Sequence, residues 1–127
     1  MSHSVVISGD SKGMLRGMPF NAMKNAVLGE SYLLSVAIVN EEASQKLNRI
    51  YRGINTPTDI LSFPLSEDEG EIVFNLKEAR KEAKKFGRKF DNFLAFLFIH
   101  GLVHLKGLDH GKKMEQEEER IRKQFDI

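Results

Sequence analysis

Apolar residues recur along the chain with two periods, one typical of short strands and one typical of amphipathic helices. Apolar runs predict strands over residues 5–7, 32–39, 60–63 and 72–74. The run over 32–39 is apolar almost throughout, which indicates a strand buried on both faces. Helical spacing predicts helices over residues 19–28, 77–86, 92–105 and 113–124, and a further helix that is capped by Asn40.

This order of strands and helices predicts an α/β (α+β) fold, in which a small mixed sheet packs against helices. The length of 127 residues fits one domain with one core, so we expect a single domain over residues 1–127. The helix over 92–105 is apolar almost all round. We therefore expect it at the centre of the domain, covered on several sides.

The same pattern predicts which side chains of the other elements are buried. In the helix after Asn40, the apolar stripe comprises Ala43, Leu47, Ile50 and Tyr51. In the helix over 77–86, the residues expected to face the core are Ala79, Ala83 and Phe86. Pro64 is expected to end the strand over 60–63, and the acidic residues of 67–70 are expected in an exposed loop.

Composition excludes several classes of protein. Apolar residues make up 41% and charged residues 29% of the chain, and the net charge is +1. These are the values of an ordinary globular protein with no overall preference for nucleic acid or membrane. There is no cysteine, so disulfides, thiolate zinc sites and a cysteine nucleophile are excluded. The first residues do not resemble a secretory signal and the apolar run 93–99 is too short for a membrane span, which favours a cytoplasmic protein without a membrane partner.

Three of the four histidines fall within eleven residues, in the run HGLVHLKGLDH at 100–110. His100 and His104 are four residues apart on the predicted central helix, so their side chains lie on one face. Gly107 permits a turn that would bring His110 to the same point. Three imidazoles with one open position are typical of a catalytic zinc site, so these histidines are expected to bind one zinc ion. Nickel and copper also suit such ligands.

The same histidine spacing occurs in zincin metallopeptidases, whose motif has a glutamate after the first histidine as the general base. Here that position is Gly101, which has no side chain that could accept a proton. A metallopeptidase of zincin-like geometry therefore becomes the second hypothesis. A third hypothesis is a non-catalytic protein whose metal only stabilises the fold.

Two motifs resemble those of one family. HGLVHLKGLDH resembles the H-G-x-L-H-L-x-G-y-D-H signature of the YbeY family of bacterial endoribonucleases and ribosomal-RNA maturation factors. LNRIYRGINTPTDILSFP, at 47–64, resembles that family's N-x-x-Y-R-x-x-x-x-P-T-D-V-L-S-F-P block, and GEIVF resembles its G-D-I-V strand. The resemblance covers about residues 31–120, with Glu71 in place of the family's aspartate.

The resemblance implies a zinc-dependent endoribonuclease that prefers single strands and acts in maturation of small-subunit ribosomal RNA and in ribosome quality control. It implies that His100, His104 and His110 bind the metal, that His100 belongs to the catalytic centre, and that Arg52 is the catalytic arginine. Ribosomal RNA is then the expected partner, with proteins of the small ribosomal subunit as further candidates. With this resemblance, the non-catalytic alternative becomes a ribosome assembly factor whose metal only stabilises the fold.

Other polar residues allow more than one interpretation. Asp109 is suited either to orient a metal-bound imidazole or to cap the last helix. Thr58 and Asp59 fit an ordinary turn, and neither is expected to be catalytic. Lys77, Lys81, Lys84 and Arg88 form one helical stripe that would suit an RNA backbone, although such stripes are usually just solvated. No aromatic stacking motif for RNA is evident, and the nine phenylalanines are interpreted mainly as core.

Overall fold

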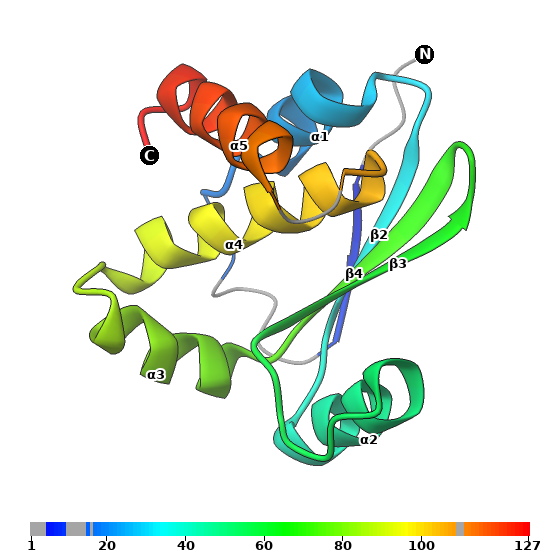
Figure 1. Ribbon diagram of the computed structural model, residues 1–127, viewed down its shortest axis with the longest axis vertical. Helices are drawn as coiled ribbons and strands as arrows, with labels where there is room; N and C mark the ends of the chain where they lie inside the picture. Colours follow the sequence, from blue (N-terminus) through cyan, green and yellow to red (C-terminus); the bar gives the residue numbers. More distant parts are fainter. Residues whose placement is uncertain (1–4, 10–14, 16, 109–110) are drawn as a thin grey trace.

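The computed structural model describes residues 5–9, 15, 17–108 and 111–127. Strands and helices alternate much as the apolar pattern predicts (Figure 1). In chain order the elements are β1 (Val6–Ser8), α1 (Phe20–Leu28), β2 (Leu33–Ile38), α2 (Glu41–Arg52), β3 (Ile60–Ser66), β4 (Glu69–Phe74), α3 (Leu76–Lys85), α4 (Phe90–Leu105) and α5 (Lys112–Gln124). Within the described residues, no helix is both long enough and apolar enough to cross a membrane.

The sheet is small and mixed, which confirms the predicted α+β fold. Its strand order is β1-β2-β4-β3. β1 pairs with β2, and β2 with β4, in parallel, whereas β3 and β4 form an antiparallel hairpin. β3 is therefore an edge strand, and this edge borders the candidate site described below.

Helix α4 lies at the centre of the molecule, as its apolar character predicts. It packs against β3 and β4 on one side and against α1, α3 and α5 on the others (Figure 1). Phe98, Ile99 and Leu102 are fully buried on it. Burial of each such side chain stabilises the fold by about 1.5–3 kcal/mol relative to exposure, so this helix anchors the core.

The prediction that the second strand is buried on both faces is wrong. Leu34 and Val36 of β2 are buried, but Leu33 is 42% exposed, so the helices cover only one face of this strand. The expected end of the third strand at Pro64 is also wrong, because β3 continues to Ser66. Proline lacks the N–H that an inner strand would donate, but an edge strand tolerates it, and the register shifts at this point. Part of the predicted acidic loop is also strand, since β4 begins at Glu69.

Helix α2 begins as predicted, but a different face of it is buried. Asn40 caps it by accepting a hydrogen bond from the N–H of Ala43 at 2.8 Å. The expected apolar residues Ile50 and Tyr51 are exposed, whereas Ser44 and Asn48 are buried. These two side chains bind the loop between α2 and β3 through polar contacts, which a search for apolar spacing does not detect.

Those contacts fix the loop that leads to the site. The Asn48 side-chain amide donates to the carbonyl of Thr56 at 2.9 Å, and the N–H of Thr58 donates to the Ser44 hydroxyl at 3.1 Å. Hydrogen bonds of this kind each contribute about 1 kcal/mol. They hold the end of α2 against the start of β3, and so place Arg52 beside β3.

Candidate active site

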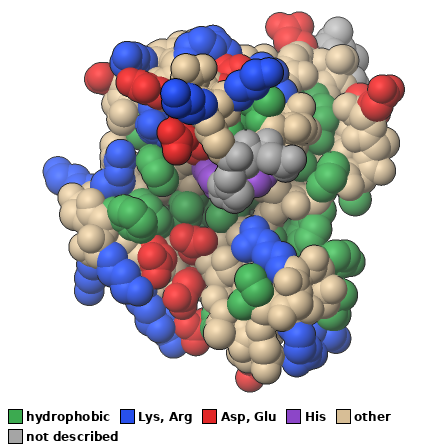
Figure 2. Space-filling model, viewed as in Figure 1, with side chains coloured by type: hydrophobic (Ala, Val, Ile, Leu, Met, Phe, Trp, Pro, Cys, Tyr) green, Lys and Arg blue, Asp and Glu red, His purple; other side chains and the backbone are tan. Residues whose placement is uncertain are grey.

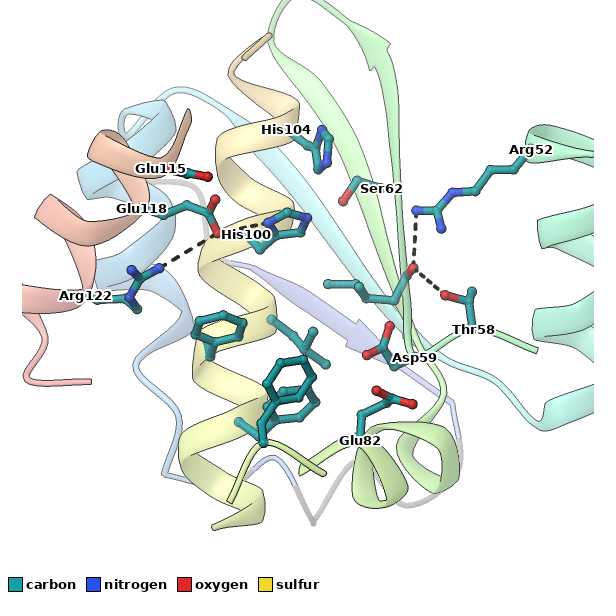
Figure 3. Close-up of a pocket in the computed structure, with 15 residues that line it drawn as sticks. Arg52, Thr58, Asp59, Ser62, Glu82, His100, His104, Glu115, Glu118 and Arg122 are labelled. Carbon is teal, nitrogen blue, oxygen red and sulfur yellow. Dashed lines mark hydrogen bonds and ion pairs between the residues drawn. The ribbon is translucent and has the colours of Figure 1, made fainter. Parts of the chain in front are cut away.

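A cavity of about 800 Å³ lies between α4 and the elements around it. One face of α4 contributes Phe93, Leu97, His100 and His104, which follow at the spacing of a helix face. The polar side chains that line the cavity come from α2 to β3 and from α3 on one side, and from α5 on the other (Figure 3): Arg52, Thr58, Asp59, Ser62, Glu82, Glu115, Glu118 and Arg122.

His100 and His104 lie one turn apart, as their spacing predicts. Their ring centroids are 4.8 Å apart and the ring planes are nearly perpendicular, at 89°. In the space-filling view, histidine is visible in a hollow near the middle of the face (Figure 2). This arrangement lets two imidazole nitrogens approach a common ion from neighbouring directions, as two ligands of a zinc site do.

The third predicted ligand, His110, and its neighbour Asp109 lie outside the described residues. Among the residues that are described, no group of three or more histidine, aspartate or glutamate side chains is arranged to hold a metal ion. The three-histidine zinc site therefore stays a prediction, of which the structure describes the pair on α4.

The carboxylate of Glu118 contacts the imidazole of His100. Its Oε1 is 2.9 Å from Nδ1 of His100, and Glu118 is only 7% exposed (Figure 3). A carboxylate at Nδ1 favours the tautomer with the proton on that nitrogen, so a metal ion would be bound through Nε2. Arg122, one turn further along α5, is 3.9 Å from the same oxygen and balances part of its charge.

Interpretation of the sequence did not identify Glu118, although a signal was present. The last helix buries Met114, Glu118 and Ile121, so this glutamate lies in line with the apolar stripe of α5. A carboxylate on a buried stripe needs a partner. The sequence cannot tell that this partner is His100, because the two helices meet only through tertiary packing.

Arg52, the predicted catalytic arginine, reaches the cavity from the end of α2. Its Nη2 donates to the carbonyl of Ile60 at 3.5 Å, and Thr58 donates to the same carbonyl at 3.4 Å. Arg52 and His104 also line a second, smaller hollow beside β3. The structure therefore brings together Arg52, His100 and His104 around one cavity, from two helices that are distant in the sequence.

Gly101 faces the sheet. A Cβ at this position would lie 2.9 Å from Oγ of Ser62 and 3.1 Å from Cδ1 of both Ile60 and Ile72. Ser62 also donates a hydrogen bond to the Gly101 carbonyl at 3.4 Å. The missing zincin glutamate is thus explained by close packing of α4 on β3 and β4, which leaves no room for a long side chain.

Asp59 was expected to belong to an ordinary turn, but its carboxylate lines the cavity near Glu82 (Figure 3). Burial raises the pKa of Asp59 above its ordinary value of 3.8, and the negative charge of Glu82 raises it further. Part of this is offset by the backbone amides of Asp59 and Ile60, which stabilise the ionised form. Asp59 is therefore a carboxyl group suited to accept and release a proton within this cavity.

Two of the four cations of the predicted basic stripe are paired with a carboxylate. Lys77 and Lys81 lie 3.5 and 3.6 Å from Glu41 of α2. Arg88 instead turns toward α4, where its guanidinium lies 4.6 Å from the centre of the Phe96 ring. The stripe as a whole is thus not a continuous track of uncompensated charge for an RNA backbone.

Together, the fold and the cavity define a small α+β protein whose central helix presents a histidine pair to a cavity lined by both polar and apolar side chains, an arrangement found in metal-dependent hydrolases. The family model described as Endoribonuclease YbeY matches residues 11–126. The chain therefore belongs to the YbeY family.

Relatives named Endoribonuclease YbeY support this assignment. The chain is 43% identical to the one from Carboxydothermus hydrogenoformans over 98 residues, which cover 73% of this chain and 66% of that protein. It is 32% identical to the one from Halalkalibacterium halodurans, with 100% of this chain and 90% of that protein covered. The match to Caldanaerobacter subterraneus spans 64% of the relative, so some matches cover slightly less than two thirds of the relative's length.

A solved structure has the same fold. The solution structure of TM1509 from Thermotoga maritima matches with a TM-score of 0.65 and 26% sequence identity. The match covers 93% of this chain and 86% of the other.

Proposed function

We propose that this protein is a zinc-dependent endoribonuclease that cleaves single-stranded RNA, in maturation of the small-subunit ribosomal RNA and in ribosome quality control. Ribosomal RNA would be its substrate, proteins of the small subunit its further partners, and the cytoplasm its compartment. Membership of a family whose model is described as Endoribonuclease YbeY supports the reaction class.

One observation supports this proposal above the others. The histidine pair on the buried helix α4 lines one cavity together with the guanidinium of Arg52, and the carboxylate of Glu118 contacts one of the two imidazoles. Imidazoles held by carboxylates are the usual zinc ligands of proteins, so the donor set fits zinc, with His110 as the third ligand. Bound there, zinc would lower the pKa of a coordinated water and stabilise negative charge on a phosphoryl oxygen.

The chain's own residues supply the rest of the proposed chemistry. Arg52 binds the non-bridging oxygens of the scissile phosphodiester, because a planar guanidinium contacts two oxygens at once. Glu118 holds the proton at Nδ1 of His100 and keeps that ring oriented. Asp59 is the proposed proton acceptor, since its raised pKa places it closer to neutrality than an ordinary carboxyl group. The pH–rate profile of Asp59→Asn tests this role, and the variant is expected to lack the acidic limb of the profile.

Cleavage of a labelled single-stranded RNA tests the proposed function. Wild-type protein loaded with zinc is expected to cleave it, and a chelator, His104→Ala or Arg52→Ala is expected to reduce the rate by at least about 100-fold. Lys77→Ala is the matched control, because Lys77 is an exposed cation outside the cavity. Circular dichroism establishes that each variant is folded.

The other outcomes separate the alternatives. Folded, metal-loaded protein that leaves RNA intact but cleaves a peptide library, with no effect of Arg52→Ala, would favour the metallopeptidase. Protein that unfolds when the metal is removed, and that binds ribosomal components without cleaving RNA, would favour the assembly factor.

A further inference from the structure

We propose that Phe86 is a stacking platform for an unpaired base of the RNA, at the end of the cavity away from His104. This inference rests on the proposed function and adds the feature by which the site would select single strands. Phe86 was expected in the core with Ala79 and Ala83, but its side chain is 62% exposed. The reason is that α3 ends at Lys85, so Phe86 already belongs to the turn.

Phe86 continues a stack of aromatic rings that begins inside the protein. Its ring centroid is 5.5 Å from that of Phe93, with 21° between the planes. Phe93 in turn stacks on Phe96 at 5.9 Å and 14°. Phe93 is 1% exposed and Phe86 is 62% exposed, so the stack continues from a buried ring to an exposed residue. A nucleobase is a flat ring that extends such a stack.

The backbone holds Phe86 in a defined position. The N–H of Phe86 donates to the carbonyl of Glu82 at 3.1 Å, and the N–H of Arg88 donates to the carbonyl of Ala83 at 3.0 Å. Between them, Gly87 adopts a left-handed conformation with φ of 64°, as is typical of a helix end. The ring is therefore presented at a fixed point, and little conformational entropy would be lost when a base stacks on it.

The charges around this stack suit a nucleic acid more than an apolar protein partner. Arg88 and Arg122 both cover the ring of Phe96, at 4.6 and 5.2 Å from its centre. Of the carboxylates that line the cavity, Glu82 is paired with Lys85 at 3.1 Å and Glu118 is held by His100 and Arg122, while Asp59 lies near Glu82. Stacked rings flanked by cations are the combination that binds single-stranded nucleic acids.

Binding of a short single-stranded oligoribonucleotide tests this platform, measured by fluorescence anisotropy in His104→Ala so that no cleavage occurs. Adding Phe86→Ala to this background is expected to weaken binding by about 5- to 100-fold, and Phe86→Trp is expected to preserve it. Leu65→Ala is the matched control, because Leu65 is also 62% exposed but lies on the β3 hairpin. In the same background, the fluorescence of an oligonucleotide that contains 2-aminopurine is expected to be quenched on binding. Of the two added substitutions, only Phe86→Ala is expected to abolish this quenching.

Each result decides between the two proposals. A wild-type protein that cleaves RNA, together with a Phe86→Ala variant that binds it with unchanged affinity, overturns the platform and leaves the endoribonuclease standing. Equal losses with Phe86→Ala and Leu65→Ala also overturn the platform, because they indicate a general effect of apolar surface. A wild-type protein that neither binds nor cleaves RNA overturns the proposed function and the platform with it.

Discussion

At the scale of single residues, the site depends on the carboxylate that contacts His100 and orients its ring. His100 contacts a buried carboxylate at hydrogen-bond distance, and this contact favours the tautomer with the proton on Nδ1. Burial of Glu118 is costly unless it is paired, so its contacts with His100 and Arg122 stabilise both the fold and the orientation of the imidazole.

Glu118→Gln is expected to lower zinc affinity by about 10- to 100-fold, because the neutral amide retains the shape of the carboxylate but makes the imidazole a weaker ligand. Competition with a chromophoric chelator measures this affinity without any activity assay. Glu119→Gln is the control, since Glu119 is exposed on the same helix and lies 3.3 Å from Lys123. Equal zinc affinity in both variants would contradict the role of Glu118.

At the scale of elements, the contact between α4 and the sheet decides what chemistry this helix supports. Gly101 allows the helix to approach β3 so closely that an added Cβ would crowd Ser62, Ile60 and Ile72. The histidines flanking that contact are turned toward the cavity, while the position after His100 is turned toward the sheet. The histidine spacing of a metallopeptidase motif is therefore present, but a glutamate at position 101 would point toward the sheet.

Gly101→Glu is expected to destabilise the protein by about 1–3 kcal/mol or more, since the longer side chain overpacks the interface and brings a charge into it. Gly101→Ala is expected to change stability by less than about 1 kcal/mol, because the gain in helix propensity offsets the crowding. Urea denaturation of the two variants measures both values. A stable Gly101→Glu variant with peptidase activity would refute this account of the interface.

At the scale of the whole molecule, the cavity exists only because the chain brings α2, α3, α4, α5 and β3 around one point. Asp59 is half-buried where it lines this cavity, and this burial raises its pKa. The folded state consequently binds the Asp59 proton more tightly than the unfolded state, so ionisation of this group opposes folding. Its effect is absent below the unfolded pKa of about 4 and develops as the pH rises through the folded pKa.

Asp59→Asn removes this opposing effect. Relative to wild type, the free energy of unfolding of the variant is expected to increase as the pH rises from about 4, and then to level off above the folded pKa of Asp59. Urea denaturation at intervals from pH 4 to 8 measures the difference. A constant difference over this range would show that the pKa of Asp59 is not raised in the folded protein.

Much of the fold follows from local patterns in the sequence. The order of strands and helices, the central position of α4 and the shared face of His100 and His104 depend on periodicity within a few residues, and the structure agrees with each. The predictions from the sequence were wrong where a local pattern competes with a tertiary contact. Ile50 and Tyr51 follow helical spacing, yet α2 is held through Ser44 and Asn48 because polar bonds to the loop before β3 decide which face is buried.

The sequence by itself determined the helix that carries the histidine pair and the absence of a glutamate after His100. Only the tertiary structure decided that Glu118 contacts His100, that Asp59 is half-buried near Glu82, and that Phe86 is exposed at the end of an aromatic stack. The physical reason is the range of the interactions. Helical spacing acts over one turn of chain, whereas burial, pKa and ring contacts depend on residues that are distant in sequence and adjacent only once the core has packed.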